Sequence, residues 1–302
     1  MQIQISSMEN SSSSTKSWRY TLFIQISLCF LLYIAFNIGT HHSHRSAITA
    51  RNNSSDLFFL SVRGGFRSHN QQIHILKQME KVAKTYGVKF VINISEFGKN
   101  DTLLQSGTMH FPSLQIPWYT TNELHGQGNR YFQKKIPLQQ KKTLDVIVID
   151  TESLQNYFPN GQASKNDSDH ISWLTRTLQT TDSDWRIVVG YDWLLECKDK
   201  NGIKKEYQSI YNVFTKFQVN AYLSKQACTN LYVRKGSITH IGNMSPTDEP
   251  SSANYSSIVD REMQNGFFLH KVGLLDFVSY YVNPSSEIVF RSTLHQSGKE
   301  FM

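Results

Sequence analysis

The hydrophobic pattern divides the chain into one long apolar run near its start and a series of short apolar segments after residue 56. The long run covers residues 20–39 (YTLFIQISLCFLLYIAFNIG), close to the ~20 apolar residues with which a helix crosses a bilayer. It exceeds the ~7–15 residue core of a cleaved signal peptide, and no small-residue cleavage site follows it. We therefore predict an uncleaved transmembrane signal anchor over residues 20–39, preceded by a disordered cytosolic tail at residues 1–19.

A polar segment without apolar periodicity separates this run from the rest of the chain. Residues 40–55 are predicted to form a stem, and residues 56–302 a single lumenal domain long enough to bury a core. This order predicts a single-pass type II membrane protein of the endomembrane system or the cell surface. Its first partner is then the membrane, contacted through one N-terminal helix.

The short apolar segments alternate between strand and helix patterns. Five are typical of strands, at residues 57–62, 88–94, 145–149, 186–190 and 219–223. Helical spacing predicts three helices: one from an Asn70 cap to Gly87, one capped by Asp167 or Asp169, and one over residues 210–217. Strands that alternate with single helices indicate βαβ units and an α/β fold.

The remaining segments predict more β-structure and two loops. Short strands are expected at residues 231–234 and 237–241, and a terminal hairpin is expected from residues 266–282 and 287–293. Residues 99–115 and 245–257 are predicted to be polar loops.

Seven N-glycosylation sequons lie beyond the apolar run, and they favour a secretory route, in which such motifs are used. They begin at Asn52, Asn53, Asn93, Asn100, Asn166, Asn243 and Asn254.

The cysteines give little further information on the compartment. Cys29 lies in the predicted anchor, and Cys197 and Cys228 either form one lumenal disulfide or remain two free thiols.

Composition and charge exclude several classes of protein. The 302 residues are 39% hydrophobic and 18% charged, an ordinary globular composition that excludes a collagen-like or wholly disordered chain. The net charge of +7 comes from scattered lysines and arginines, with no block of five like charges. Because nucleic-acid binding needs clustered basic charge, we expect no nucleic-acid partner.

Chemistry in an open α/β sheet is expected beyond the carboxyl ends of its strands. There the sequence has RGGFR at residues 63–67, SEFGK at 95–99, YD at 191–192 and SKQAC at 224–228. A further segment, PWYTTNELHG, covers residues 117–126.

These segments, taken in order, resemble the purple acid phosphatase branch of the calcineurin-like metallophosphoesterases. FFLSVRGGFRSHNQ resembles the family's strand and GDWG motif, and PWYTTNELHG resembles its PWY and GNHD motifs. DVIVIDT, DWRIVVGYD and VNAYLSKQAC continue the likeness across most of residues 56–302. The resemblance implies an α/β (α+β) sandwich of two packed β-sheets flanked by helices, and a site for two metal ions.

The resemblance also locates the family's seven metal ligands, and this chain departs from most of them. They fall on Arg63, Glu96, Lys99, Leu124, Tyr191, Gln226 and Cys228, of which only Glu96 is a conservative change. His125 retains the family's non-ligand catalytic histidine. Since Arg63 and Lys99 would place cations where dications belong, we predict that the two-metal centre is lost and that no cofactor is bound.

The sequence therefore predicts a catalytically inactive pseudophosphatase that acts as a lumenal binding or scaffolding module. Its further partner would be a lumenal protein or an anionic ligand attracted by Arg63. One alternative is an active acid phosphatase-type hydrolase with a rebuilt metal site. A more remote one is a Golgi glycosyltransferase, whose D-x-D motif would be sought at residues 150–152, 167–169 or 182–184.

Overall fold

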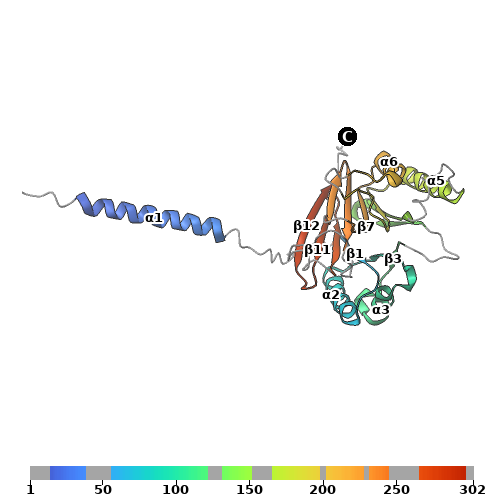
Figure 1. The fold of residues 1–302 in the computed structure, drawn as a ribbon, viewed down its shortest axis with the longest axis horizontal. Helices are drawn as coiled ribbons and strands as arrows, with labels where there is room; N and C mark the ends of the chain where they lie inside the picture. Colours follow the sequence, from blue (N-terminus) through green and yellow to red (C-terminus); the bar gives the residue numbers. More distant parts are fainter. Residues whose placement is uncertain are drawn as a thin grey trace, which may run out of the picture. The chain divides into compact units, whose positions relative to one another are not determined.

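The computed structural model describes residues 14–38, 56–121, 131–151, 165–197, 202–227, 231–244 and 265–296. Contacts divide the chain into two units, residues 1–47 and residues 48–302. The first unit contains one helix, α1 (Ser14–Ile38). The second contains two β-sheets and their helices (Figure 1).

Helix α1 covers most of the predicted anchor and begins before it. Its 25 residues include the described apolar side chains of Trp18, Phe23 and Phe30, all exposed. Among the residues whose side chains are described, no helix combines the length and the apolar character that a membrane crossing requires.

The first sheet has six strands in the order β12-β11-β10-β1-β2-β3. Their bounds are β1 (Leu57–Arg63), β2 (Val91–Ile94), β3 (Trp118–Thr120), β10 (Phe267–Val272), β11 (Asp276–Val282) and β12 (Ile288–His295). Strands β1, β2 and β3 are parallel, while β10 pairs with β1 in the antiparallel sense. The sheet is therefore mixed.

The second sheet also has six strands, in the order β4-β5-β6-β7-β9-β8. They are β4 (Phe132–Pro137), β5 (Thr143–Val148), β6 (Trp185–Val189), β7 (Ala221–Lys225), β8 (Tyr232–Lys235) and β9 (Ile238–Asn243). The four central strands are parallel, and the antiparallel strands β4 and β8 form the two edges. Parallel strands buried on both faces explain the continuous apolar runs of β5 and β6.

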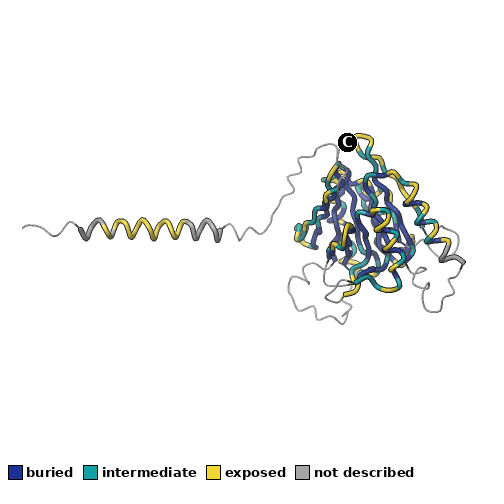
Figure 2. The backbone as a smooth tube through the Cα atoms, turned by 90° about the horizontal axis from the view of Figure 1, so that it is seen from above, coloured by how far each residue is buried: buried dark blue, intermediate teal, exposed yellow. Residues whose placement is uncertain are grey.

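Helices cover the outer face of each sheet, and the two sheets pack on each other (Figures 1 and 2). Helices α2 (His69–Tyr86) and α3 (Thr102–His110) lie on the first sheet, and α5 (Lys165–Thr180) and α6 (Gln208–Lys216) on the second. Short 3₁₀ turns occur at η1 (Gly98–Asn100), η2 (Pro112–Leu114), η3 (Gln139–Lys141) and η4 (Lys205–Tyr207). The central core contains side chains from both sheets, among them Phe59, Trp185 and Phe268. This arrangement confirms the predicted two-sheet α/β architecture.

Several element boundaries differ from the predictions for local reasons. Helix α2 begins after Ser68 rather than Asn70, because Ser68 and Gln71 form a capping box. Asp167 and Asp169 lie inside the first turns of α5 instead of capping it. The predicted strand over residues 266–282 is two strands, β10 and β11, separated by a turn at Gly273.

The predicted loop at residues 99–115 is also wrong, because it contains helix α3. Asp101 caps this helix by accepting hydrogen bonds from the backbone N–H groups of Leu103 and Leu104. Strands β3 and β4 were not predicted either. Both are short or half-exposed edge strands without a strong apolar pattern.

Candidate functional site

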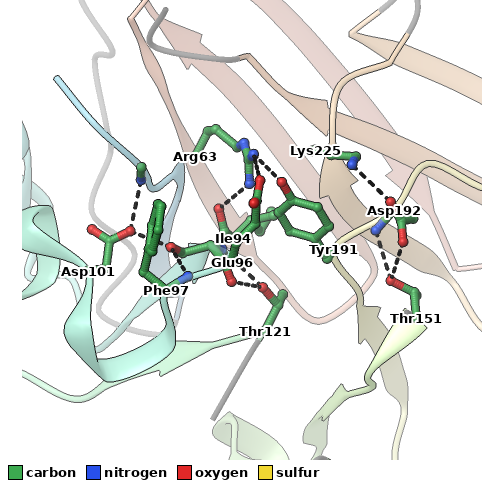
Figure 3. Close-up of polar contacts among 12 residues, drawn as sticks. Arg63, Ile94, Glu96, Phe97, Asp101, Thr121, Thr151, Tyr191, Asp192 and Lys225 are labelled. Carbon is green, nitrogen blue, oxygen red and sulfur yellow. Dashed lines mark hydrogen bonds and ion pairs between the residues drawn. The ribbon is translucent and has the colours of Figure 1, made fainter. Parts of the chain in front are cut away.

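The carboxyl ends of β1, β2 and β6 bring together three residues that the resemblance placed at metal-ligand positions (Figure 3). Arg63 is the last residue of β1, Glu96 follows β2 and Tyr191 follows β6. Arg63 Nη2 donates to Glu96 Oε1 over 3.2 Å and to the Tyr191 hydroxyl over 2.5 Å. Arg63 Nη1 donates to the Ile94 carbonyl over 3.1 Å. A guanidinium group thus joins the two sheets at this edge.

Tyr191 contacts two cations. The Arg63 guanidinium carbon lies 4.4 Å from the centre of the Tyr191 ring, and Lys225 Nζ lies 4.0 Å from it. Both distances allow cation–π attraction. Lys225 also pairs with Asp192 Oδ1 at 2.9 Å, and Asp192 Oδ2 accepts a hydrogen bond from the Thr151 hydroxyl over 3.1 Å. The two cations of the site are therefore matched by the carboxylates of Glu96 and Asp192.

Asp101 organises the loops on the first-sheet side of the site and was not identified from the sequence. Its buried carboxylate accepts hydrogen bonds from the Gly65 N–H over 2.8 Å and from the Ser95 hydroxyl, besides capping α3. A Cβ on Gly64 would overlap the Asp101 carboxylate and would lie 2.6 Å from Asn93 Oδ1. Gly64 is therefore required by close packing, and Gly65 by its positive φ of +107°.

A second arginine lies deep beside this cluster. Arg67 donates to Asn265 Oδ1 over 2.6 Å and to the Arg63 carbonyl over 2.5 Å. Its Nη1 is buried and has no hydrogen-bond partner among the described residues. Burial lowers the pKa of Arg67 to about 10 and also lowers that of Arg63. Arg67 therefore remains protonated at neutral pH.

The other predicted site positions are partly outside the described residues. Lys99 lies in η1 and is exposed, and Gln226 follows β7, with its backbone N–H bonded to the Asn243 carbonyl. Leu124, His125 and Cys228 lie outside the residues that the structure describes. The structure thus brings Arg63, Glu96 and Tyr191 into contact.

The described residues at this edge do not fit two metal ions. In the described part of the chain, no group of three His, Cys, Asp or Glu side chains could hold one. The carboxylate of Glu96 is paired with Arg63, and that of Asp192 with Lys225. A two-metal centre needs several anionic or imidazole ligands to offset four positive charges. Instead, this edge carries two cations, Arg63 and Lys225.

A buried chain of hydrogen bonds crosses between the sheets beneath the site. The Ser61 hydroxyl donates to Asn243 Oδ1 over 3.0 Å, and it lies 2.8 Å from His270 Nε2. His270 Nδ1 lies 2.8 Å from the Ser279 hydroxyl. Because the single Ser61 proton goes to Asn243, His270 Nε2 must carry a proton, so Nδ1 accepts from Ser279 in the neutral ring. Burial lowers the pKa of His270 to about 3, which keeps it neutral.

The structure corrects the glycosylation prediction at two sequons. The side chains of Asn93 and Asn243 are 0% and 1% exposed. A glycan on either could not be accommodated in the folded domain, so both predictions are wrong for the native fold. Asn100 is exposed in η1. Asn166 lies in α5, and nothing is described of its side chain. Asn52, Asn53 and Asn254 lie outside the described residues.

The cysteines and the D-x-D motifs complete the predicted residues. Cys197 is disulfide-bonded and Cys29 is free. In the 182–184 motif, Asp182 pairs with Lys135, and Asp184 Oδ2 accepts from the Thr143 N–H over 3.0 Å. These carboxylates make structural contacts before β6, not at a strand end where a nucleotide sugar would bind.

Comparison with known proteins supports the fold. No protein-family model and no curated protein matches the chain. Among solved structures it is similar to GAP50, the anchor in the inner membrane complex of Plasmodium, with a TM-score of 0.62 and 16% identity over 82% of this chain and 90% of that one. The likeness to GAP50 supports the two-sheet α/β fold. At this identity the likeness concerns the fold alone.

Two further solved structures are similar to the chain with lower TM-scores. PhoD has a TM-score of 0.46 and 10% identity, covering 80% of this chain and 68% of PhoD. A predicted phosphoesterase from Streptococcus pneumoniae has a TM-score of 0.39 and 9% identity, covering 80% of this chain and 98% of that one.

Proposed function

We propose that the protein is a membrane-anchored, lumenal binding or scaffolding module, built on the phosphoesterase fold and without phosphatase activity. One observation carries this proposal: Arg63 contacts Glu96 and Tyr191 at three positions where the resemblance expects metal ligands. An ion-pair network then takes the place of the metal centre in joining the two sheets.

Electrostatics supports this replacement. A metal ion at the Arg63 position would have to displace a side chain that makes three hydrogen bonds, and a second cation, Lys225, contacts the same Tyr191 ring. Two unit charges of like sign repel by about 4 kcal/mol at 4 Å near a protein surface, and a dication doubles that cost. The site favours its own two cations over an added metal.

The anchor is the second part of the proposal. A helix of 25 residues would be about 37 Å long, enough for a hydrocarbon core of ~30 Å. The sequons after it favour residues 40–302 in the lumen. GAP50, which has a similar fold, is described as an anchor in a membrane complex. By analogy, this chain would hold a partner protein at a membrane of the secretory pathway.

The structure favours a protein partner over a small anion bound by Arg63. Three of the five N–H donors of Arg63 are engaged by Glu96, Tyr191 and the Ile94 carbonyl, so a phosphate-like anion would compete with the Glu96 carboxylate for the same charge. We therefore propose that partner contacts use the exposed surface around the site and not the guanidinium itself.

The test is a phosphomonoesterase assay on full-length protein purified in detergent. Activity would be measured from acidic to neutral pH with added iron, zinc or manganese, beside the Glu96→Gln variant. We expect both proteins to show the same background rate. Turnover that depends on metal and is lost in Glu96→Gln would overturn the proposal in favour of an active hydrolase.

A further inference from the structure

Two exposed phenylalanines lie in the loops that follow β1 and β2, next to the site. Phe66, in the loop after β1, is 67% exposed, and Phe97, in the loop after β2, is 36% exposed. Their ring centres are 4.9 Å apart in an edge-to-face arrangement. Large aromatic side chains that are paired with each other yet exposed to water indicate a surface that something else covers.

A sequon begins three residues after Phe97. The Asn100 N–H donates to the Phe97 carbonyl over 2.9 Å, closing a turn that is made possible by Gly98, whose φ is +54°. Such a turn brings the Cα atoms of its first and fourth residues within about 7 Å. Asn100 is exposed, and its side-chain amide makes no hydrogen bond to another described residue. The acceptor amide is therefore open beside the aromatic pair.

Asp101 fixes this turn against the loop that carries Phe66. Its backbone N–H bonds to the Gly98 carbonyl, and its carboxylate holds the Gly65 N–H, adjacent to Phe66. Thr102, the third sequon residue, is exposed and donates to Gln72 Oε1 over 3.3 Å. These contacts thus fix the phenylalanine pair, the acceptor Asn100 and the hydroxyl residue Thr102 relative to one another.

We infer that Asn100 carries an N-linked glycan and that the aromatic pair of Phe66 and Phe97 is the platform on which its first sugar rests. This rests on the lumenal topology proposed above. In the transfer, the Asn100 amide nitrogen forms a bond to C1 of the first N-acetylglucosamine. The bond from C1 to the lipid diphosphate donor breaks, and the amide proton leaves with that diphosphate. The apolar C–H face of the sugar then packs on an aromatic ring, as apolar groups do elsewhere.

The position of this glycan has a consequence for the site. Asn100 is four residues from Glu96, whose carboxylate pairs with Arg63. A branched glycan rooted there covers the edge at which the family's substrates would enter. It would restrict a protein partner to the part of the surface around the site that the glycan does not cover, because N-glycans are bulky and solubilising.

The experiment uses the full-length chain made in a eukaryotic secretory cell. Glycopeptide mass spectrometry is expected to find Asn100 occupied and Asn93 and Asn243 empty. Thr102→Ser preserves the sequon and should retain the glycan, while Asn100→Gln removes it. If other sequons carry glycans and Asn100 does not, the inference is wrong while the lumenal topology stands. If no sequon carries a glycan, the topology fails as well.

The platform is tested separately by thermal unfolding. Trimming the glycan to its first sugar should leave Tm unchanged, whereas complete removal should lower it by about 2–4 °C, the shift expected for one modest contact in a domain of this size. In Phe97→Leu, which keeps an apolar side chain without an aromatic face, the difference between glycosylated and deglycosylated protein should vanish. The same difference in wild type and Phe97→Leu would contradict the platform.

Discussion

Two buried histidines should make the domain unstable in acid. His240 and His270 are fully buried, and burial lowers the pKa of each to about 3, with Lys235 adding to the effect at His240. In an unfolded chain both would titrate near 6.5. The unfolded state therefore takes up protons below pH ~6.5 that the folded state does not bind until pH ~3. The free energy of unfolding is highest above pH ~6.5 and falls as the pH falls.

The size of this effect follows from the linkage between proton binding and folding. Between pH 7 and pH 5 each histidine costs about 2 kcal/mol of stability, and the two together about 4 kcal/mol. At pH 5 this sum hardly depends on the folded pKa values, provided that they lie below ~4. Since domains are usually stable by only ~5–15 kcal/mol, the loss is a large fraction of the total.

The assay is urea unfolding of the purified protein at pH 7 and pH 5, followed by circular dichroism. His240→Phe should halve the pH dependence, because the ring would keep its stacking with Tyr211 and lose the titrating group. It should not destabilise at pH 7, since neither ring nitrogen of His240 has a partner among the described residues. His110→Gln, at an exposed histidine, is the matched control. A wild-type loss below ~1 kcal/mol, or an unchanged slope in His240→Phe, would refute the reasoning.

Three further predictions concern the site and its surroundings. Arg63→Met should lower the free energy of unfolding by about 1–3 kcal/mol, because Glu96 and Tyr191 lose a charged donor. Urea unfolding measures this change, and an unchanged midpoint would show that the network does not join the sheets. Gly64→Ala should cost at least about 1–3 kcal/mol, since the added methyl group meets Asn93 and Asp101; a variant with wild-type Tm would contradict that packing. Because Cys197 is disulfide-bonded and Cys29 is free, thiol counting on the denatured, unreduced chain should find one reactive thiol, and three would exclude a Cys197–Cys228 pair.

Much of the fold could be predicted because its central strands are continuous apolar runs. Strands β1, β5 and β6 are buried on both faces, so their apolar composition alone predicts strands at these segments. Helix α3 was missed because its nine residues bury only Leu103 and Gly107, too few for a helical period. The turn between β10 and β11 was missed because Leu274 and Leu275 stand in it, where polar turn residues are usual.

The candidate site could be predicted only in part. Strand ends marked Arg63, Glu96 and Tyr191 as positions of interest, but nothing local indicates that residues 128 positions apart share a hydrogen bond. The role of Asp101 could not be predicted from the sequence for a different reason. Its role depends on the buried contacts with Gly65 and Ser95 and on the close packing of Gly64, which are properties of the folded loops.

The measurement that tests the central claim most directly is the metal content of the full-length protein, purified without chelators and analysed by plasma mass spectrometry. An ion-pair network of Arg63, Glu96 and Tyr191 in place of a metal centre predicts iron, zinc and manganese far below one ion per chain, before and after incubation with each metal. The claim would be contradicted if the protein, with Arg63 and Glu96 unsubstituted, bound about two ions per chain, which is the stoichiometry of a two-metal site.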